Sequence, residues 1–258
     1  MYLWVAVSLF AGVLSFFCCT IATMLAERSG MITQPGERQS HEFATPTGGG
    51  LGLIISILVT TSCVQLLTPL TDFWWYNMVP GIVILAIVGW RDDKQHISPI
   101  IRILVQLAVS LWLLGYGWSE LSLKGMGLMA VTVVAMIWMM NLYNFMDGSN
   151  GMAGFQGMFA GITMAVLLQM GDQDAMSLVA LMVAAACAGF LPLNFPRARV
   201  FMGDVASVPL GFIFAALLVF GLQTGSLNWP ASLLVMSLFI VDATLTLLRR
   251  VFRGERWY

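Results

Sequence analysis

Long runs of apolar residues alternate with short polar stretches along the whole 258-residue chain. A helix of about 20 apolar residues crosses a bilayer core of about 30 Å, and most of the runs reach or approach that length. Backbone groups cannot stay unpaired in lipid, and the runs lack the strict alternation of strands, so we expect helices rather than a barrel. The pattern predicts about nine membrane-spanning helices, at residues 3–25, 48–68, 76–90, 99–116, 127–141, 152–170, 175–193, 205–223 and 229–248.

The composition indicates an integral membrane protein. Hydrophobic residues make up 59% of the chain and charged residues 10%, whereas soluble domains carry about 25% charged residues. The first apolar run is too long for the core of a signal peptide and has no basic segment before it, so we expect it to be retained. We therefore predict an all-α, polytopic helical bundle that forms a single domain over residues 1–258.

The basic residues indicate how this bundle is oriented. If the N-terminus lies outside, eleven of the twelve Lys and Arg residues fall on one side and only Lys124 falls on the other. The positive-inside rule makes the first side, which carries the C-terminus, cytoplasmic. Since these residues follow topology and form no separate patch, nothing favours nucleic-acid binding. The eleven are Arg28, Arg38, Arg91, Lys94, Arg102, Arg197, Arg199, Arg249, Arg250, Arg253 and Arg256.

The acidic residues divide between the two predicted sides, with Asp72, Glu120, Asp172 and Asp174 outside. Asp92, Asp93, Asp147 and Asp204 fall at or just within the cytoplasmic ends of helices. Buried acids are costly in lipid, so their convergence on one face indicates a functional site. Asp242 lies within the last predicted span, where we expect it to pair with polar groups inside the bundle or to belong to an ion path.

Asp92 and Asp93 end an apolar run and are followed by Lys94 and Arg102. Two adjacent carboxylates repel each other, and a divalent cation or nearby basic groups would relieve that repulsion. The alternative is a solvated loop whose acids have no specific role.

Asn141, Asn144 and Asp147 are spaced three residues apart and precede Gly148 and Gly151. This spacing keeps the three side chains on one helical face or its frayed end. Their oxygens suit a hard cation or a sugar-nucleotide, and the two glycines permit close approach of a phosphate. The alternative is helix capping, which explains one of the three residues more easily than all of them.

Asp204 opens the eighth predicted span, where the helix dipole favours an acid, so simple capping is the alternative to a ligand role. Arg197 and Arg199 nearby suit contacts to phosphate or anionic lipid, or anchor the topology. His41 precedes the glycines of residues 48–50, whose backbone at a helix start can bind anions. A solvated loop histidine is the other interpretation.

Taken together, these stretches resemble the polyprenyl-phosphate N-acetylhexosamine-1-phosphate transferases. The residues of the motifs are closer to those of the branch that initiates O-antigen, common-antigen and teichoic-linkage synthesis than to those of the muramoyl-pentapeptide branch. The ordered combination of four motifs is more specific than any one of them. The motifs are residues 41–50 (HEFATPTGGG), Asp92-Asp93 with Ser98, Pro99, Arg102 and Gln106, residues 141–148 (NLYNFMDG), and residues 194–204 (NFPRARVFMGD).

The resemblance implies transfer of N-acetylhexosamine-1-phosphate from a UDP-sugar to undecaprenyl phosphate, in the bacterial inner membrane and with a cytoplasmic active site. It implies Mg²⁺, with Mn²⁺ as an alternative, held by Asp204 and Asn144. It also implies Asp92, Asp93 and Asp147 as catalytic residues. The implied substrate contacts are His41, Lys94, Arg102, Asn141, Gly148, Asn194, Arg199 and Phe201.

Two other interpretations stay open. The chain ends at Tyr258, soon after the ninth predicted span, whereas the family continues into a further loop and helices, so a truncated or inactive homologue that binds lipid phosphate is one alternative. An ion-coupled transporter using Asp242 is the other. The sequence leaves open the sugar, the pathway, direct transfer or a covalent intermediate, and whether the protein forms a homodimer.

Overall fold

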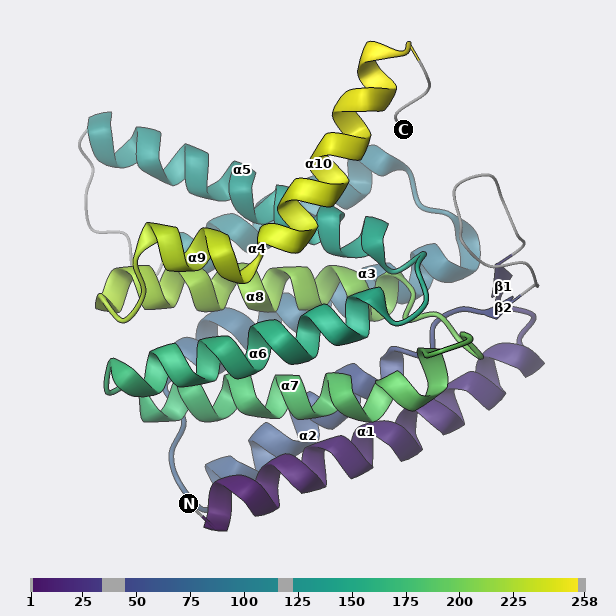
Figure 1. Cartoon of the computed structure of the whole chain (residues 1–258), viewed down its shortest axis with the longest axis horizontal. Helices are drawn as coiled ribbons and strands as arrows, with labels where there is room; N and C mark the ends of the chain where they lie inside the picture. The colour runs from purple at the N-terminus through teal and green to yellow at the C-terminus, as the bar shows by residue number, and fades with distance from the viewer. Residues whose placement is uncertain (1, 34–44, 116–122, 255–258) are drawn as a thin grey trace.

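A computed structural model describes residues 2–33, 45–115 and 123–254, which form a bundle of helices lying side by side (Figure 1). The all-α class predicted from the apolar runs is confirmed; a two-stranded antiparallel sheet, in which Ile32 pairs with Pro46, is a small addition. The helices are α1 (Tyr2–Arg28), α2 (Leu51–Gln65), α3 (Val79–Gln95), α4 (Pro99–Gly115), α5 (Leu123–Met146), α6 (Met152–Met170), α7 (Asp174–Asn194), α8 (Asp204–Thr224), α9 (Trp229–Val235) and α10 (Ser237–Phe252), with strands β1 (Ile32–Thr33) and β2 (Thr45–Pro46) and a π-helix η1 (Phe73–Met78) before α3.

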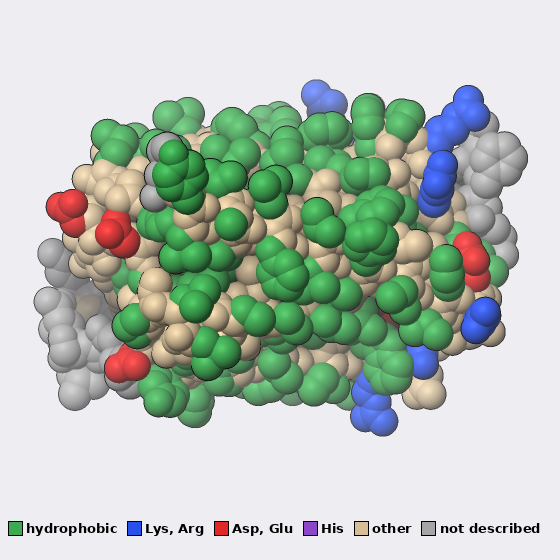
Figure 2. All heavy atoms as spheres, turned by 90° about the horizontal axis from the view of Figure 1, so that it is seen from below, with side chains coloured by type: hydrophobic (Ala, Val, Ile, Leu, Met, Phe, Trp, Pro, Cys, Tyr) green, Lys and Arg blue, Asp and Glu red, His purple; other side chains and the backbone are tan. Residues whose placement is uncertain are grey.

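Several of these helices suit a membrane. Within the described ranges, six are long and apolar enough to cross one, and a seventh is added if α9 and α10 count as one broken span. α2 and α4 are shorter apolar helices. The chain is thus a polytopic helical membrane protein, while nine spans stay a prediction. Hydrophobic side chains cover the middle of the face shown in Figure 2, and Lys and Arg side chains gather toward one end.

α8 lies at the centre of the bundle. It is apolar on all sides, as expected of a helix surrounded by others, and it packs against α3 and α5. A second set of contacts joins α2, α1, α7 and α6. Between these helices, Ser56 donates to the carbonyl of Ala11 at 2.8 Å and Ser15 donates to the carbonyl of Ala186 at 2.7 Å. Such short polar contacts join helices where apolar surface alone gives little preference.

Three sequence predictions differ from the structure. The run 229–248 is not one straight span, because the chain bends by 73° between α9 and α10 at Met236. Asp242 is exposed on α10 and not buried inside the bundle, so an ion path through the bundle loses its main residue. The gap between the predicted spans 127–141 and 152–170 is also shorter, since α5 continues to Met146.

Candidate active site

The entrance to α8 is the centre of the candidate site. α8 begins at Asp204, and Gly203 before it has a φ of 77°, a conformation that glycine adopts without strain. A Cβ at residue 203 would lie 2.6 Å from Oδ2 of Asp93 and 2.8 Å from the main-chain nitrogen of Gly48. Glycine is therefore required here both for the turn and for the close approach of two other segments.

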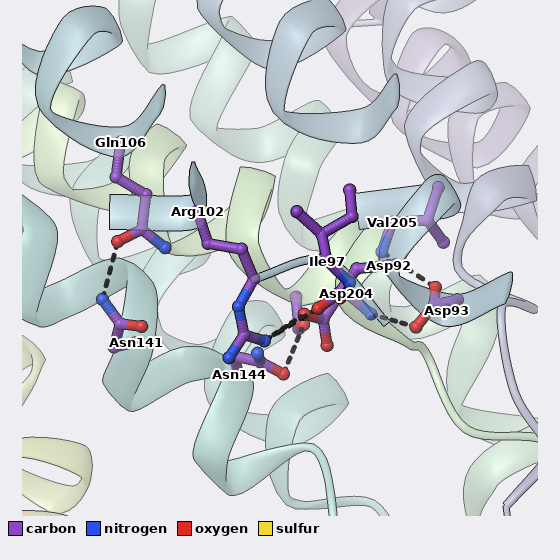
Figure 3. A network of polar contacts seen from close by, with 10 residues as sticks. Asp92, Asp93, Ile97, Arg102, Gln106, Asn141, Asn144, Asp204 and Val205 are labelled. Carbon is purple, nitrogen blue, oxygen red and sulfur yellow. Dashed lines mark hydrogen bonds and ion pairs between the residues drawn. The ribbon is translucent and has the colours of Figure 1, made fainter. Parts of the chain in front are cut away.

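Asp93, near the end of α3, caps α8 from outside. Its Oδ1 accepts a hydrogen bond from the main-chain N–H of Asp204 at 3.0 Å, and its Oδ2 accepts one from Val205 at 3.1 Å. The first N–H groups of a helix have no partner within the helix, and Gly203 has no side chain to serve them. A carboxyl from a helix more than a hundred residues earlier satisfies them instead (Figure 3).

Asp147, just beyond the end of α5, accepts hydrogen bonds from the two residues that precede Asp204. Its Oδ2 accepts from the N–H of Gly203 at 2.7 Å and its Oδ1 from that of Met202 at 3.2 Å. Burial raises the pKa of this carboxyl, the two backbone hydrogen bonds lower it, and the charge of Asp93 raises it. Together these effects give a pKa of about 7. Residues 202–205 thus donate four consecutive N–H groups to two acids.

Arg102, in the first turn of α4, lies between two further acids. Its Nη1 is 2.8 Å from Oδ2 of Asp92 and 3.3 Å from Oδ2 of Asp204. Oδ1 of Asp92 accepts from the N–H of Ile97, which fixes the turn between α3 and α4. The Asp92 side chain is 8% exposed, that of Asp204 18% and that of Arg102 36%, so Arg102 and Asp204 are the more accessible members.

The two asparagines of α5 contact different neighbours. Oδ1 of Asn144 accepts from the Ser207 hydroxyl of α8 at 3.2 Å, so it lies one helical turn from Asp204. Nδ2 of Asn141 donates to Oε1 of Gln106 on α4 at 2.8 Å. The predicted spacing therefore brings Asn144 and Asp147 to α8, whereas Asn141 faces α4.

The glycine-rich stretch before α2 has a different role from the anion binding considered for it. The N–H groups of Gly49 and Gly50 donate to the carbonyls of Phe201 and Met202, at 3.2 and 3.0 Å. The N–H of Phe201 in turn donates to the carbonyl of Pro46 at 2.9 Å. These amides are thus used to pair residues 46–50 with the segment that leads into α8.

The remaining predicted substrate residues lie at varied places. Nζ of the exposed Lys94 sits 3.9 Å from the centroid of the Trp90 ring, a cation–π contact. Asn194 is buried, with Oδ1 accepting from Gly151 at 2.8 Å and Nδ2 donating to the carbonyl of Val200 at 2.8 Å, so it ties two loops together. Arg199 is exposed, Phe201 is buried, Gly148 lies in the turn after α5, and His41 falls outside the described residues.

A small pocket opens between α3, α4 and α8. It is lined by Asp92, Arg102, Gln106 and Asp204 on its polar side and by apolar residues of the three helices. Within the described parts of the chain, no group of three or more His, Cys, Asp or Glu residues could hold a metal. Mg²⁺ needs only one or two carboxylates, because it keeps waters and binds substrate phosphates. Asp204 and Asn144 fit an ion of that kind and not a fully protein-enclosed one.

Sequence reasoning missed Gly89. A Cβ at this position of α3 would clash with the main-chain carbonyl group of Asp204, so the helices cross there with backbone against backbone. Its place three residues before Asp92 is the only signal in the sequence, and it is a weak one.

The sequence profile of Glycosyl transferase family 4 matches residues 74–222, more than half of the chain. The chain belongs to glycosyl transferase family 4. This confirms the family resemblance drawn from the four motifs. The matched region of this glycosyl transferase family 4 member contains Asp92, Asp93, Asn144, Asp147 and Asp204.

Relatives in glycosyl transferase family 4 carry named activities. Decaprenyl-phosphate N-acetylglucosaminephosphotransferase of Mycobacterium tuberculosis is 30% identical over 81% of this chain and 58% of its own length. A probable undecaprenyl-phosphate N-acetylglucosaminyl 1-phosphate transferase of Bacillus subtilis is 27% identical over 91% of this chain and 68% of its own. Phospho-N-acetylmuramoyl-pentapeptide-transferase of a Synechococcus species is 30% identical over 80% and 64%. The chain thus spans less than two thirds of the mycobacterial and cyanobacterial proteins.

Proposed function

We propose that the chain transfers N-acetylhexosamine-1-phosphate from a UDP-sugar to a polyprenyl phosphate such as undecaprenyl phosphate. An oxygen of the lipid phosphate bonds to the β-phosphorus of the donor, the bond from that phosphorus to the oxygen of UMP breaks, and lipid-diphosphate-sugar forms. The activities of the family relatives support this reaction. The observation that carries it is the placement of Arg102 between Asp92 and Asp204 in a pocket at the end of three helices.

The main barrier to this reaction is repulsion between two anions. Arg102 and the exposed Lys94 supply positive charge at the end of α3 and the start of α4. Fixed charges aimed at developing charge are the usual means by which such transfers are accelerated. The nucleophile needs no strong base, because the second pKa of a phosphate monoester is about 6 and the group is largely dianionic at neutral pH.

Asp204 and Asn144 would hold Mg²⁺, or Mn²⁺ in its place. The bound ion would neutralise phosphate charge and orient the donor. Asp204 suits this role because its carboxyl lies at the pocket and is more accessible than that of Asp92. Asn144 suits it because its Oδ1 faces α8 one turn beyond Asp204.

Direct transfer fits the geometry better than a covalent aspartyl-phosphate. Both oxygens of Asp92 accept hydrogen bonds, one from Ile97 and one from Arg102. A carboxylate held in this way orients a cation and a turn, and it is poorly placed to attack phosphorus. Asp92 therefore acts by holding Arg102 toward the phosphates.

The topology is proposed on the same grounds. The start of α1 and the start of α8 lie toward opposite ends of the bundle (Figure 1), and basic side chains gather toward one end (Figure 2). Following the positive-inside rule, we place the site on the cytoplasmic side of a bacterial inner membrane and the N-terminus outside, with nine spans. A homodimer, and substrate contacts from His41, Asn141, Gly148, Arg199 and Phe201, stay predictions.

Release of UMP tests the proposal. Purified protein is incubated with Mg²⁺, undecaprenyl phosphate and a panel of labelled UDP-N-acetylhexosamines, and we expect UMP and labelled lipid with at least one donor. Asp204→Asn should lower the rate of UMP release by about a hundredfold or more. Asp72→Asn, just before η1 and so at the end of α3 away from Asp92, should leave the rate unchanged. Protein that binds undecaprenyl phosphate but releases no UMP with any donor would favour the inactive, binding-only alternative.

A further inference from the structure

We propose that Asp93 and Asp147 are positioning residues that set the place of Asp204 by holding the backbone at the entrance to α8. This deepens the proposed function, and it depends on that function only for the role of Asp204. The four hydrogen bonds from residues 202–205 carry the inference.

The bonding pattern is complete for these two acids. Each of the four carboxyl oxygens accepts one main-chain N–H, at distances from 2.7 to 3.2 Å. A buried N–H without a partner is costly, so the entrance to α8 depends on both acids for its conformation. Among described residues, the pocket lining includes Asp92 and Asp204 but neither Asp93 nor Asp147.

Each acid also adjoins a residue of the candidate site. Asp93 follows Asp92 and accepts hydrogen bonds from the first turn of α8. These bonds fix Asp204 relative to Asp92, and both of these acids contact Arg102. Asp147 is three residues after Asn144 and accepts a hydrogen bond from Gly203. This bond fixes the start of α8 relative to the Asn144 side chain, which contacts Ser207. The two acids thus set Asp204 against α3 on one side and α5 on the other.

The direct test is hydrogen–deuterium exchange of the amides of residues 202–205, followed by mass spectrometry on the full chain without metal. Asp93→Asn should raise exchange at 204 and 205 by about tenfold, and Asp147→Asn at 202 and 203, since an amide side chain offers one acceptor instead of two. Asp92→Asn is a matched neighbour, and it should raise exchange at Ile97 but not at 202–205. Asp72→Asn should change none of these amides.

A second measurement separates positioning from direct action on substrate. Mn²⁺ binding, followed by electron paramagnetic resonance, should weaken by about tenfold in Asp93→Asn and Asp147→Asn, although neither residue is assigned as a ligand of the ion. Wild-type exchange at 202–205 in a variant that has lost UMP release would overturn the inference, because the acid would then act on the substrate itself.

Folding failure does not end the test. Circular dichroism and size-exclusion chromatography identify a variant that does not fold, and Asp93→Glu then replaces it. The longer side chain keeps the charge but displaces the carboxyl, so faster exchange at 204 and 205 is expected, and wild-type exchange there would contradict the inference. Exchange requires no turnover, so a wild-type protein that releases no UMP would remove the proposed reaction and leave this result standing.

Discussion

Gly89 of α3 packs directly against the main-chain carbonyl of Asp204, with no room for a side chain between the two backbones. Asp92 lies three residues further along the same helix, and residues at this spacing share a face. The backbone contact therefore brings two acids within reach of one guanidinium, at 2.8 and 3.3 Å from Nη1 of Arg102.

Gly89→Ala should separate α3 from α8 at this crossing. Overpacking of this kind costs about 1–3 kcal/mol of folding stability, and it should also weaken Mn²⁺ binding because Asp204 moves away from its neighbours. Thermal unfolding in detergent and a Mn²⁺ titration measure the two effects. Gly127→Ala on α5 is the matched control, since a Cβ there meets nothing within 4 Å; equal behaviour of the two variants would contradict the role given to Gly89.

Gly203→Ala should be more harmful than the same change at Gly225. Both glycines have positive φ, 77° and 74°, but the ψ of 168° at Gly203 lies in a region essentially restricted to glycine, whereas the ψ of 4° at Gly225 lies in the left-handed helical region that other residues tolerate better. Only at residue 203 would the new Cβ also approach Asp93 and Gly48, whereas residue 225 has open space around it. A larger fall in melting temperature for Gly203→Ala, with faster exchange at 204 and 205, is the expected result. Equal losses would contradict the role given to Gly203.

Arg102→Gln should affect metal binding and catalysis in opposite directions. The guanidinium is a positive charge beside Asp92 and Asp204, so its removal should tighten Mn²⁺ binding by about threefold or more. Turnover should fall by about tenfold or more, because the phosphates lose a fixed positive charge. Arg91→Gln, an exposed change on α3, is the control for metal affinity. Weaker Mn²⁺ binding in Arg102→Gln would show instead that the guanidinium supports the metal site.

Asp147 should make stability depend on pH near neutrality. Its pKa is raised from 3.8 to about 7 in the folded protein, so the folded chain holds this proton more tightly than the unfolded chain. The resulting stabilisation is complete at a pH below the pKa of Asp147 in the unfolded chain, and it is lost as pH rises through about 7. The melting temperature of the metal-free wild type, minus that of Asp147→Asn, should therefore be larger at about pH 5 than at about pH 8. A difference that grows with pH would contradict the sign of the shift.

The position of the site at one end of the bundle could be predicted from the sequence. Apolar runs and basic residues assign Asp92, Asp147 and Asp204 to one side, and the contacts among α3, α5 and α8 bring them together there. The helical fold follows from the same runs. The roles of these residues remain proposals, because shared position does not show what a side chain does.

Other features could not be predicted, for physical reasons. The capping of α8 by Asp93 links residues 111 positions apart, and no local pattern specifies it. The use of Gly49 and Gly50 amides by carbonyls near residue 201 depends on tertiary pairing, so a local rule for helix starts suggested anion binding instead. The bend at Met236 interrupts an apolar run whose hydropathy alone resembles a continuous span.

Asp92, Asp204 and Arg102 lie where helices end, and under the proposed function this location sets how far the lipid substrate must travel. Under the proposed function, a phosphate on a polyprenyl chain would meet them at the depth of the surrounding head groups, while its tail stays among the acyl chains of its own leaflet. No charged group has to enter the hydrocarbon, where its transfer would cost several kcal/mol. In the proposed reaction, this arrangement would let a water-soluble nucleotide and a membrane-bound acceptor react without either leaving its own medium.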